Sequence, residues 1–361
     1  MQLGIIAALA FATTLLAGGC GAPAKTPLVA PRETPAPAAP PGPAAGDVIG
    51  RSERFVIYLP RAGESLHQIA ARFLGAEDQA WQIAEFNAIT RPQADEPVVV
   101  PLKPVNPTGV RPDQVQTVPI LSYHRFSGGN VGSASASASA GGYAGKMVVA
   151  SANFAAQLDW LARNDYHVIR LSQLPAFLEG KRPLPRRSVV ITFDDGYESV
   201  HRHALPVLRK YGFPATLFVY TDFIGAGDAL SWGQLKELDG SGLFDIQAHS
   251  KTHRNLIDRA AGESGAAYRQ AIELEARVPR ELLERRLGKP VRHFAYPYGD
   301  ANETVLEVLA RQQYELAVTV NPGGNPFFAQ PLMLRRTMIY GDYSLEDFKA
   351  KLQIRRAIES P

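Results

Sequence analysis

The chain has 361 residues, 45% of them hydrophobic and 20% charged, which is enough for one large globular domain and a smaller one. Its formal net charge is only +3, and the 38 Lys and Arg residues are spread along the chain. This balance argues against nucleic acid as a partner. The single cysteine, Cys20, cannot form an internal disulfide, so the fold must rest on its hydrophobic core.

The amino-terminal segment has the composition of an export signal. Residues 3–16 are nearly all apolar or small, and Leu16-Ala17-Gly18-Gly19-Cys20 follows at once. These five residues resemble the lipobox of bacterial lipoproteins, which implies a signal peptide over residues 1–20 and lipidation of Cys20. The protein would then be a secreted lipoprotein of the cell envelope, at the periplasmic face of the outer membrane in a Gram-negative organism. An uncleaved membrane anchor is the alternative, and both place the remaining chain outside the cytoplasm.

Residues 21–50 are expected to form a linker. Eight prolines interleaved with alanine lie between Ala22 and Pro43. Such a stretch favours extended polyproline II and can hold a folded body away from a membrane. A disordered tail without a role is the alternative.

A small module is predicted over residues 51–104. Strand patterns at residues 55–59 and 98–100 enclose two helical patterns, one with Leu66, Ile69 and Phe73 at helical spacing and one with Trp81 and Phe86. The segment resembles the LysM module, through the matching residues Gly63-Glu64-Ser65-Leu66, Ile69-Ala70, Trp81, Ile83-Ala84, Asn87 and Pro101. This resemblance implies binding of N-acetylglucosamine glycans such as peptidoglycan. A spacer domain that has lost its ligand is the alternative.

After a second Pro-rich linker at residues 105–117, strands and helices alternate. Strands are expected at residues 118–123, 167–170, 189–193, 216–219, 244–247, 293–295 and 316–320, and helices at residues 154–163, 204–211 and 268–287. This alternation predicts an α/β fold, a parallel sheet with helices outside, either open or closed into a barrel. The Ser-Ala repeats and glycines within residues 127–146 predict a low-complexity surface loop.

Polar clusters follow two of the predicted strands. Asp194 and Asp195 lie in Thr192-Phe193-Asp194-Asp195-Gly196, where the carboxyl end of a strand commonly carries a site. His249 and His253 are four residues apart and can reach one metal ion together. With Asp195 they make a set of two histidines and one carboxylate, which leaves positions open for water and substrate.

A third cluster is Arg292-His293-Phe294-Ala295-Tyr296-Pro297-Tyr298-Gly299, which ends a predicted strand with Pro and Gly. Arg292 is placed to pair with a carboxylate, which would lower the pKa of a base and fix its orientation. The Pro-Gly loop can point backbone N–H groups into the site.

Together the three motifs, TFDDG, H-S-x-x-H and R-x-F-x-Y-P-x-G, resemble the polysaccharide deacetylase family, the NodB-like carbohydrate esterases, over residues 118–355. The resemblance implies a distorted (β/α) barrel in which Asp194 is the general base and Arg292 orients it. It assigns Asp195, His249 and His253 to a divalent metal, most commonly Zn²⁺. The Tyr298 backbone N–H would stabilise the oxyanion, and Tyr296, Pro297 and Gly299 would contact the substrate.

The general acid is expected early in the domain. Many members of the family that the motifs resemble carry this acid in a late Leu-x-Leu-His motif. Here no histidine follows His293, whereas the first strand ends in Leu121-Ser122-Tyr123-His124. This arrangement resembles the circularly permuted branch that includes poly-N-acetylglucosamine deacetylases, and it implies that His124 protonates the leaving amine. A structural histidine that caps the strand is the alternative. The resemblance also implies a late tryptophan motif that often flanks the site. No Trp follows Trp232 here, so one wall of the substrate groove is left undefined.

These observations predict a metal-dependent hydrolase that removes N-acetyl groups from an N-acetylglucosamine polysaccharide and releases acetate. The small module favours peptidoglycan as the substrate, and the position of His124 favours an exopolysaccharide. An esterase acting on another acetylated polysaccharide such as xylan is one alternative. A non-catalytic, glycan-binding lipoprotein of the cell wall is another.

Overall fold

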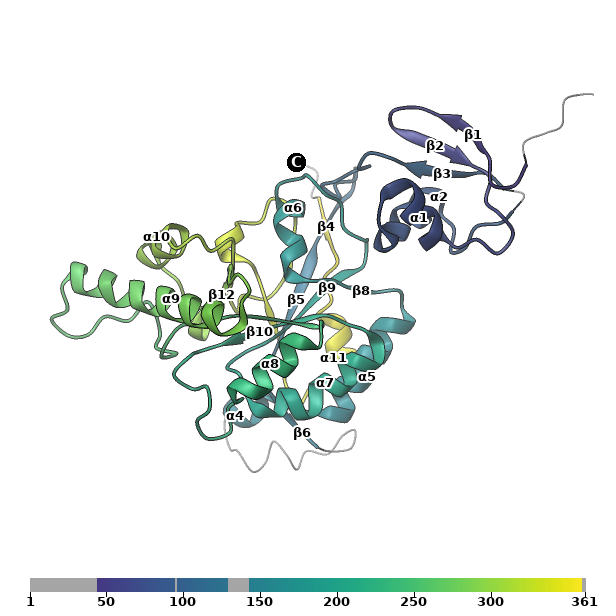
Figure 1. Cartoon of the computed structure of the whole chain (residues 1–361). Helices are drawn as coiled ribbons and strands as arrows, with labels where there is room; N and C mark the ends of the chain where they lie inside the picture. The colour runs from purple at the N-terminus through teal and green to yellow at the C-terminus, as the bar shows by residue number, and fades with distance from the viewer. Residues whose placement is uncertain (1–43, 95, 129–142, 359–361) are drawn as a thin grey trace, which may run out of the picture. The chain divides into compact units, whose positions relative to one another are not determined.

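The computed structural model describes residues 44–94, 96–128 and 143–358 (Figure 1). The predicted signal peptide with Cys20, most of the linker at 21–50 and most of the loop at 127–146 lie outside the described residues, so these predictions stay predictions. Within the described ranges, no helix is both long enough and apolar enough to span a membrane.

The small module is a three-stranded antiparallel sheet with two α-helices. Its elements are β1 (Val48–Arg51), β2 (Phe55–Tyr58), α1 (Leu66–Leu74), the 3₁₀ turn η1 (Glu77–Gln79), α2 (Ala80–Asn87) and β3 (Val98–Pro101). The two predicted helices and the two predicted strands are confirmed. The sequence did not indicate β1, because its residues are mostly exposed and show no alternation between buried and exposed positions.

Local signals explain the module's helices and their packing. Ser65 caps α1 in a capping box with Gln68, and Gly75 ends that helix with φ 81°. The Asn87 side chain donates hydrogen bonds to the carbonyls of Ile83 and Val99 and accepts one from the Val99 N–H at 2.9 Å. Asn87 therefore ties α2 to β3, which is a structural reason for this residue type at the end of α2.

The larger domain is built on a mainly parallel sheet. Within the described residues the strand order is β13-β12-β11-β10-β9-β5-β14, with β15 also paired to β5 and β8 to β9. The strands are β5 (Val118–Tyr123), β8 (His167–Val168), β9 (Ser188–Phe193), β10 (Ala215–Val219), β11 (Phe244–Ala248), β12 (His293–Ala295), β13 (Leu316–Val318), β14 (Gly324–Asn325) and β15 (Thr337–Met338). All neighbouring pairs from β5 to β13 are parallel, so the predicted parallel sheet is confirmed.

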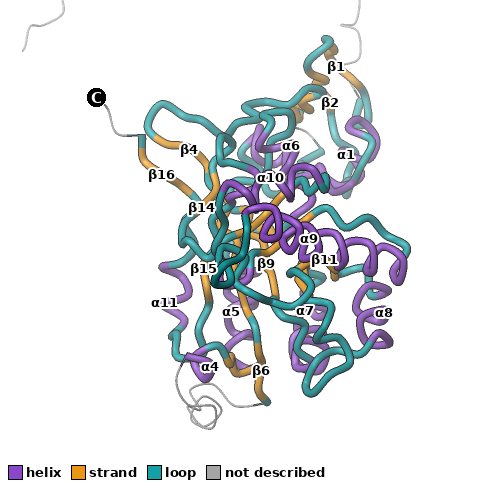
Figure 2. The backbone as a smooth tube through the Cα atoms, turned by 90° about the vertical axis from the view of Figure 1, so that its left-hand side faces the viewer, coloured by secondary structure: helices purple, strands orange, loops and turns teal. Residues whose placement is uncertain are grey.

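Helices follow most of these strands (Figures 1 and 2). They are α5 (Ser151–Arg163), α6 (Leu174–Leu178), α7 (Leu205–Tyr211), α8 (Trp232–Gly240), α9 (Gly265–Leu287), α10 (Glu303–Arg311) and α11 (Leu345–Ala350), with short turns η2 (Leu171–Gln173), η3 (Val200–Ala204), η4 (Pro297–Gly299) and η5 (Pro331–Met333). Two strand pairs lie outside the main sheet, together with a short helix: β4 (Gln114–Gln116) with β16 (Arg355–Ala357), β6 (Arg125–Ser127) with β7 (Val148–Ala150), and α4 (Tyr143–Lys146). Because β4 lies within residues 105–117, the end of that predicted linker belongs to the folded domain.

The sheet curls, and residues 334–338 bridge its two ends. Leu334 forms a parallel bridge with Val318 at the end of β13, and Thr337 of β15 pairs with Leu121 of β5. The sheet thus has the form of a curled half-barrel. The bridging segment places Arg336 at the centre of the curl, where its side chain is 0% exposed.

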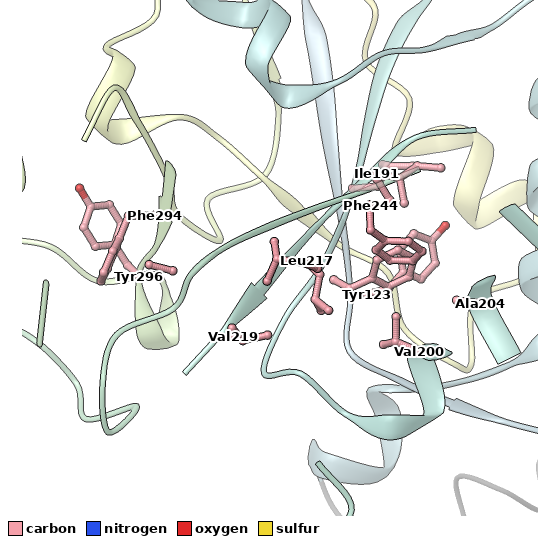
Figure 3. Packing of buried hydrophobic residues seen from close by; sticks show 14 of the residues in the cluster. Tyr123, Ile191, Val200, Ala204, Leu217, Val219, Phe244, Phe294 and Tyr296 are labelled. Carbon is pink, nitrogen blue, oxygen red and sulfur yellow. The ribbon is translucent and has the colours of Figure 1, made fainter. Parts of the chain in front are cut away.

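Alternate residues of the central strands enter two separate cores. On β9, Ile191 and Phe193 belong to the larger cluster, part of which Figure 3 shows, whereas Val190 belongs to the smaller one. The larger cluster also contains Leu158 of α5 and Leu208 of α7. The smaller cluster also contains Leu174 and Phe177 around α6. With both faces covered, the strands are apolar along their length, and polar residues concentrate in the loops beyond their carboxyl ends.

Candidate active site

The predicted site residues gather at the carboxyl ends of the parallel strands. His124 follows β5, the Asp194-Asp195 pair follows β9, and His249 follows β11. Parallel strands end at a common edge of the sheet. The registers of β5 with β9 and of β10 with β11 therefore bring His124 and His249, which are 125 positions apart in sequence, to the same edge.

Asp195, His249 and His253 form a set that can hold a metal ion. Oδ1 of Asp195 lies 3.5 Å from Nε2 of His249 and 3.2 Å from Nε2 of His253. One ligand atom from each residue lies within 4.8 Å of the others. The His249 Nδ1 is 2.7 Å from the carbonyl oxygen of Ala295, which fixes the ring and leaves Nε2 facing the set.

These residues fit a divalent metal by their chemistry. Two imidazole nitrogens and a carboxylate oxygen are ligands that zinc and similar ions accept. Oδ1 of Asp195 is buried and has no hydrogen-bond partner among the described residues, as expected for an atom that faces a cation. Burial opposes ionisation of Asp195, but the adjacent His249 and His253 outweigh it and hold the pKa of that carboxyl well below its ordinary value.

Left-handed backbone turns aim these side chains. Asp195, Ser250 and His253 have φ of 71°, 72° and 63°, which is uncommon for residues other than glycine. Such conformations persist where surrounding contacts hold them, and they gather at functional sites. Gly196 continues the first turn with φ 89°, and a Cβ there would lie 2.9 Å from Cγ1 of Val219. A glycine is therefore required directly after the two aspartates.

Asp194 lies beside the metal set, and its carboxylate is held by a buried arginine. Nη1 of Arg336 donates a 2.6 Å hydrogen bond to Oδ1 of Asp194, while Nε donates to the Thr319 carbonyl at 3.0 Å. Burial raises the pKa of Asp194, but the positive charge of Arg336 and the nearby histidines, His249 first, outweigh that effect and lower it. Asp194 is therefore a buried, ionised carboxylate.

His124 completes the group on the other side of Asp194. Its side chain is almost buried, and its Nε2 lies 3.9 Å from Oδ2 of Asp194. Burial lowers the pKa of this imidazole, although the charges of Asp194 and Asp195 oppose that shift. A histidine, a carboxylate and a metal set thus share one site, as a metal-assisted hydrolase requires.

The family model for polysaccharide deacetylases matches residues 181–317, which contain the Asp194-Asp195 and His249/His253 motifs. The chain contains a polysaccharide deacetylase domain.

Relatives are similar to a little more than half of the chain. The poly-β-1,6-N-acetyl-D-glucosamine N-deacetylase of Escherichia coli is 27% identical over 241 residues, covering 57% of this chain and 36% of the relative. The enzyme of the same name from Staphylococcus aureus is 27% identical over 196 residues, covering 52% and 67%. The chain therefore spans about a third of the length of the Escherichia coli relative. The solved structure of IcaB from Ammonifex degensii has a TM-score of 0.56 at 27% identity, covering 66% of this chain and 98% of that chain.

One residue of the deacetylase domain is not where the sequence predicted. Arg292 was expected to orient Asp194, but it forms an ion pair with Glu315 at 2.8 Å, and its side chain is 54% exposed. The prediction is wrong because Arg292 precedes β12 and so lies at the amino end of that strand, whereas the site lies at the carboxyl ends. Arg336 takes this position instead. In the sequence, Arg336 is marked only by the Arg-Arg pair at 335–336, a pattern that indicates exposed residues.

The loop after β12 also differs from expectation. Tyr296 was expected to contact substrate, but its ring is 0% exposed and its hydroxyl donates to the Leu332 carbonyl, so that prediction is wrong. Pro297 and Gly299 are likewise buried and support the loop. Tyr298 is the exception, because its side chain is 61% exposed, its φ is 62°, and its ring lies 5.0 Å from that of His253.

Glu275 is a buried residue of the deacetylase domain that the sequence analysis missed. It lies on α9 and accepts hydrogen bonds from the N–H groups of Lys251 and Thr252, both at 2.9 Å, and from the Thr252 hydroxyl at 2.7 Å. These contacts hold the middle of the loop between His249 and His253. A charged residue among the buried positions of α9 is the only sequence signal that pointed to it.

Proposed function

We propose that this protein is a metal-dependent deacetylase that removes N-acetyl groups from N-acetylglucosamine residues of a polysaccharide and releases acetate. The observation that carries the proposal is the buried Asp194 carboxylate, charge-paired with Arg336, beside the set of Asp195, His249 and His253. An ionised base next to a metal set is the arrangement that amide hydrolysis needs.

In this mechanism Asp194 accepts a proton from the water that attacks the acetyl carbonyl. Arg336 keeps the carboxylate ionised and fixed before the reaction, so no reorganisation is needed during it. Asp195, His249 and His253 would hold the metal, which supplies Lewis acidity toward the acetyl carbonyl when bound. The backbone N–H of Tyr298, at the turn with φ 62°, is the proposed donor to the negative charge that develops on the carbonyl oxygen.

His124 is the proposed general acid. Cleavage of the amide leaves the sugar nitrogen in need of a proton, and a histidine beside the base can supply it. Its Nε2 lies 3.9 Å from Oδ2 of Asp194, so the proposed acid and the proposed base lie beside each other in the same site. The balance of the reaction is one amide and one water consumed, and one acetate and one amine formed.

An exopolysaccharide of N-acetylglucosamine is the favoured substrate. It is supported by the position of His124 directly after β5 and by the two relatives, whose names give poly-β-1,6-N-acetylglucosamine as their substrate. Zinc is the proposed metal, because two imidazoles and one carboxylate make an open site of the kind zinc uses in catalysis.

The rest of the chain is proposed to place the enzyme at its substrate. The strand-helix-helix-strand module over residues 51–104 would bind N-acetylglucosamine glycan such as peptidoglycan, and a lipid on Cys20 would anchor the protein in the envelope. Replacement of Cys20→Ala should then shift the protein from the membrane fraction to the soluble fraction. Retention of the variant in membranes would contradict lipid anchoring.

The proposed activity is tested by acetate release from the purified chain with added Zn²⁺. The substrates are β-1,6-linked N-acetylglucosamine oligomers, peptidoglycan and acetylated xylan, and the variants are Asp194→Asn and, as a control on the surface of α5, Asp159→Asn. Release that needs both the metal and Asp194 supports the proposal. Release from xylan alone would indicate an esterase, and no release from any substrate with the metal bound would indicate a binding protein.

A further inference from the structure

A row of aromatic rings extends from the proposed metal residue His253. The Tyr220 ring lies 5.0 Å from the His253 ring and stacks on Phe223 at 5.0 Å with an interplanar angle of 8°. Phe223 in turn meets the Tyr197 ring at 5.5 Å, edge to face. All four side chains are half-buried. The row thus presents aromatic surface directly beside the proposed reaction centre.

Two charged groups lie at the far end of this row. The Arg125 guanidinium lies over the Tyr197 ring, 3.8 Å from its centroid, and forms a 3.0 Å ion pair with Asp228. The side chains of Arg125 and Asp228 are 40% and 59% exposed. An ion pair this exposed contributes little to folding stability, so stability alone does not explain why these groups are gathered here.

Backbone hydrogen bonds join the segment that carries Asp228 to the turn that contains Asp195 and Gly196. The Glu198 N–H donates to the Asp228 carbonyl at 2.8 Å, and the Leu230 N–H donates to the Gly196 carbonyl at 2.9 Å. Tyr197 also forms an antiparallel bridge with Ala229. Because Gly196 directly follows the proposed metal residue Asp195, the cluster holds a fixed position relative to the reaction centre.

We propose that Arg125, Tyr197, Tyr220 and Asp228 form a subsite for the sugar ring next to the one that is deacetylated. A pyranose ring has apolar C–H faces, which suit an aromatic surface, and hydroxyl groups, which suit a guanidinium, a carboxylate and a phenol. Few polar groups placed among aromatic ones are typical of small-molecule sites. The inference rests on the proposed function and adds which residues would hold the neighbouring sugar of the chain.

The proposed subsite also supplies the wall of the substrate groove that the sequence left undefined. No Trp follows Trp232 in the chain, so a late tryptophan cannot line the groove. The loop between β10 and α8, which carries Phe223 and Asp228, provides aromatic and polar groups in its place. A role limited to joining these loops is the competing explanation, and it predicts no dependence on substrate length.

The test compares substrate lengths. For the full chain with Zn²⁺, kcat/KM is measured on monomeric N-acetylglucosamine, which leaves the subsite empty, and on its β-1,6-linked pentamer, which fills it, for the wild type and for Asp228→Ala, Asp228→Asn and Tyr220→Phe. The ratio of kcat/KM for the pentamer to that for the monomer should fall by about threefold to tenfold in each variant, the effect of one lost hydrogen bond to a charged or phenolic group. Metal content and thermal midpoint are measured alongside.

The matched control is Glu281→Ala. It breaks the Arg277–Glu281 pair on α9, which has the same 3.0 Å distance and similar exposures of 44% and 54%. This variant should leave the ratio unchanged. If the wild type is active, two outcomes would overturn the subsite alone. One is an equal loss of kcat/KM on both substrates, and the other is an unchanged ratio in the Asp228 and Tyr220 variants. If the wild type has no activity on either substrate, the proposed function is overturned, and the subsite with it.

Discussion

Nη1 of Arg336 donates a 2.6 Å hydrogen bond to Oδ1 of Asp194, and the two side chains are 0% and 2% exposed. The pair joins residues 142 positions apart, one after a central strand and one in the segment that bridges the ends of the curled sheet. The segment that bridges the ends of the sheet therefore also carries the arginine that holds the proposed base ionised. Removing one partner of a buried ion pair leaves the other charge without compensation.

Arg336→Ala should abolish most of the activity. The uncompensated Asp194 carboxylate would be protonated or displaced, so we expect kcat for acetate release to fall by about hundredfold or more. Folding should weaken by about 3–5 kcal/mol, the usual cost of breaking a buried pair. Steady-state kinetics and chemical denaturation measure the two effects.

The activity of Arg336→Ala is compared with that of Arg292→Ala, because the sequence motif indicated Arg292 as the partner of Asp194 and the structure indicates Arg336. The Arg292–Glu315 pair is exposed, so its loss should change folding by less than about 1 kcal/mol and kcat by less than about twofold. A large loss of kcat in Arg292→Ala together with a small loss in Arg336→Ala would reverse the assignment.

His124→Asn should slow catalysis and leave metal binding intact. A general acid contributes about 10²–10⁴-fold, and His124 is not one of the three grouped ligand residues, so we expect kcat to fall by at least about hundredfold at unchanged metal content. Metal analysis and kinetics on the same sample check this. His67→Asn, on an exposed position of α1, is the control. Activity close to that of the wild type would leave His124 with a structural role only.

Glu275→Gln should weaken metal binding without removing a metal ligand. The carboxylate accepts three hydrogen bonds from the loop between His249 and His253, and a carboxamide cannot accept all of them in the same way. Loss of such supporting contacts typically costs about 10–100-fold in metal affinity. Competition with a chelator measures the affinity, and the absorption spectrum of the Co²⁺ form reports the ligand geometry.

The control for Glu275 is Glu273→Gln on the same helix, at a partly exposed position. It should leave both the affinity and the spectrum unchanged. Wild-type affinity and spectrum in Glu275→Gln would show that the loop holds its shape without this carboxylate.

His293 should contribute to a loss of stability at mildly acidic pH. Burial lowers its pKa, and the charge of Arg292 adds a smaller decrease. The charges of Asp245 and Glu315 and a hydrogen bond with the Arg292 backbone oppose this shift without cancelling it. The Nδ1 of His293 has no hydrogen-bond partner among the described residues. The unfolded chain, with an ordinary His pKa of about 6.5, then binds more protons than the folded chain. Stability is therefore complete above about pH 6.5 and declines as the pH falls toward the lowered folded-state pKa.

His293→Phe removes this titration, so the free energy of unfolding should decline less between pH 7 and pH 5 than in the wild type. Chemical denaturation at both pH values gives the difference. Part of the decline should remain, because the pKa of the buried His124 is also lowered. An identical decline in the two proteins would mean that His293 titrates normally in the fold.

The sequence predicted what depends on short stretches of chain. Alternation of apolar strands and amphipathic helices gave the parallel sheet, since each pattern is repeated within about ten residues. The acidic and histidine motifs after β9 and β11 were visible for the same reason. Asp195, His249 and His253 could be grouped because parallel strands bring their carboxyl ends to one edge.

The tertiary structure decided the contacts between segments that share no local sequence pattern. Arg336 reaches Asp194 only because residues 334–338 bridge the ends of the sheet, and Glu275 reaches its loop only because α9 lies against β11. Arg292 has the residue type that the site needs but lies at the wrong end of its strand. Sequence spacing fixes which side of an element a residue is on, whereas the partner of a buried charge is fixed by the closure of the whole sheet.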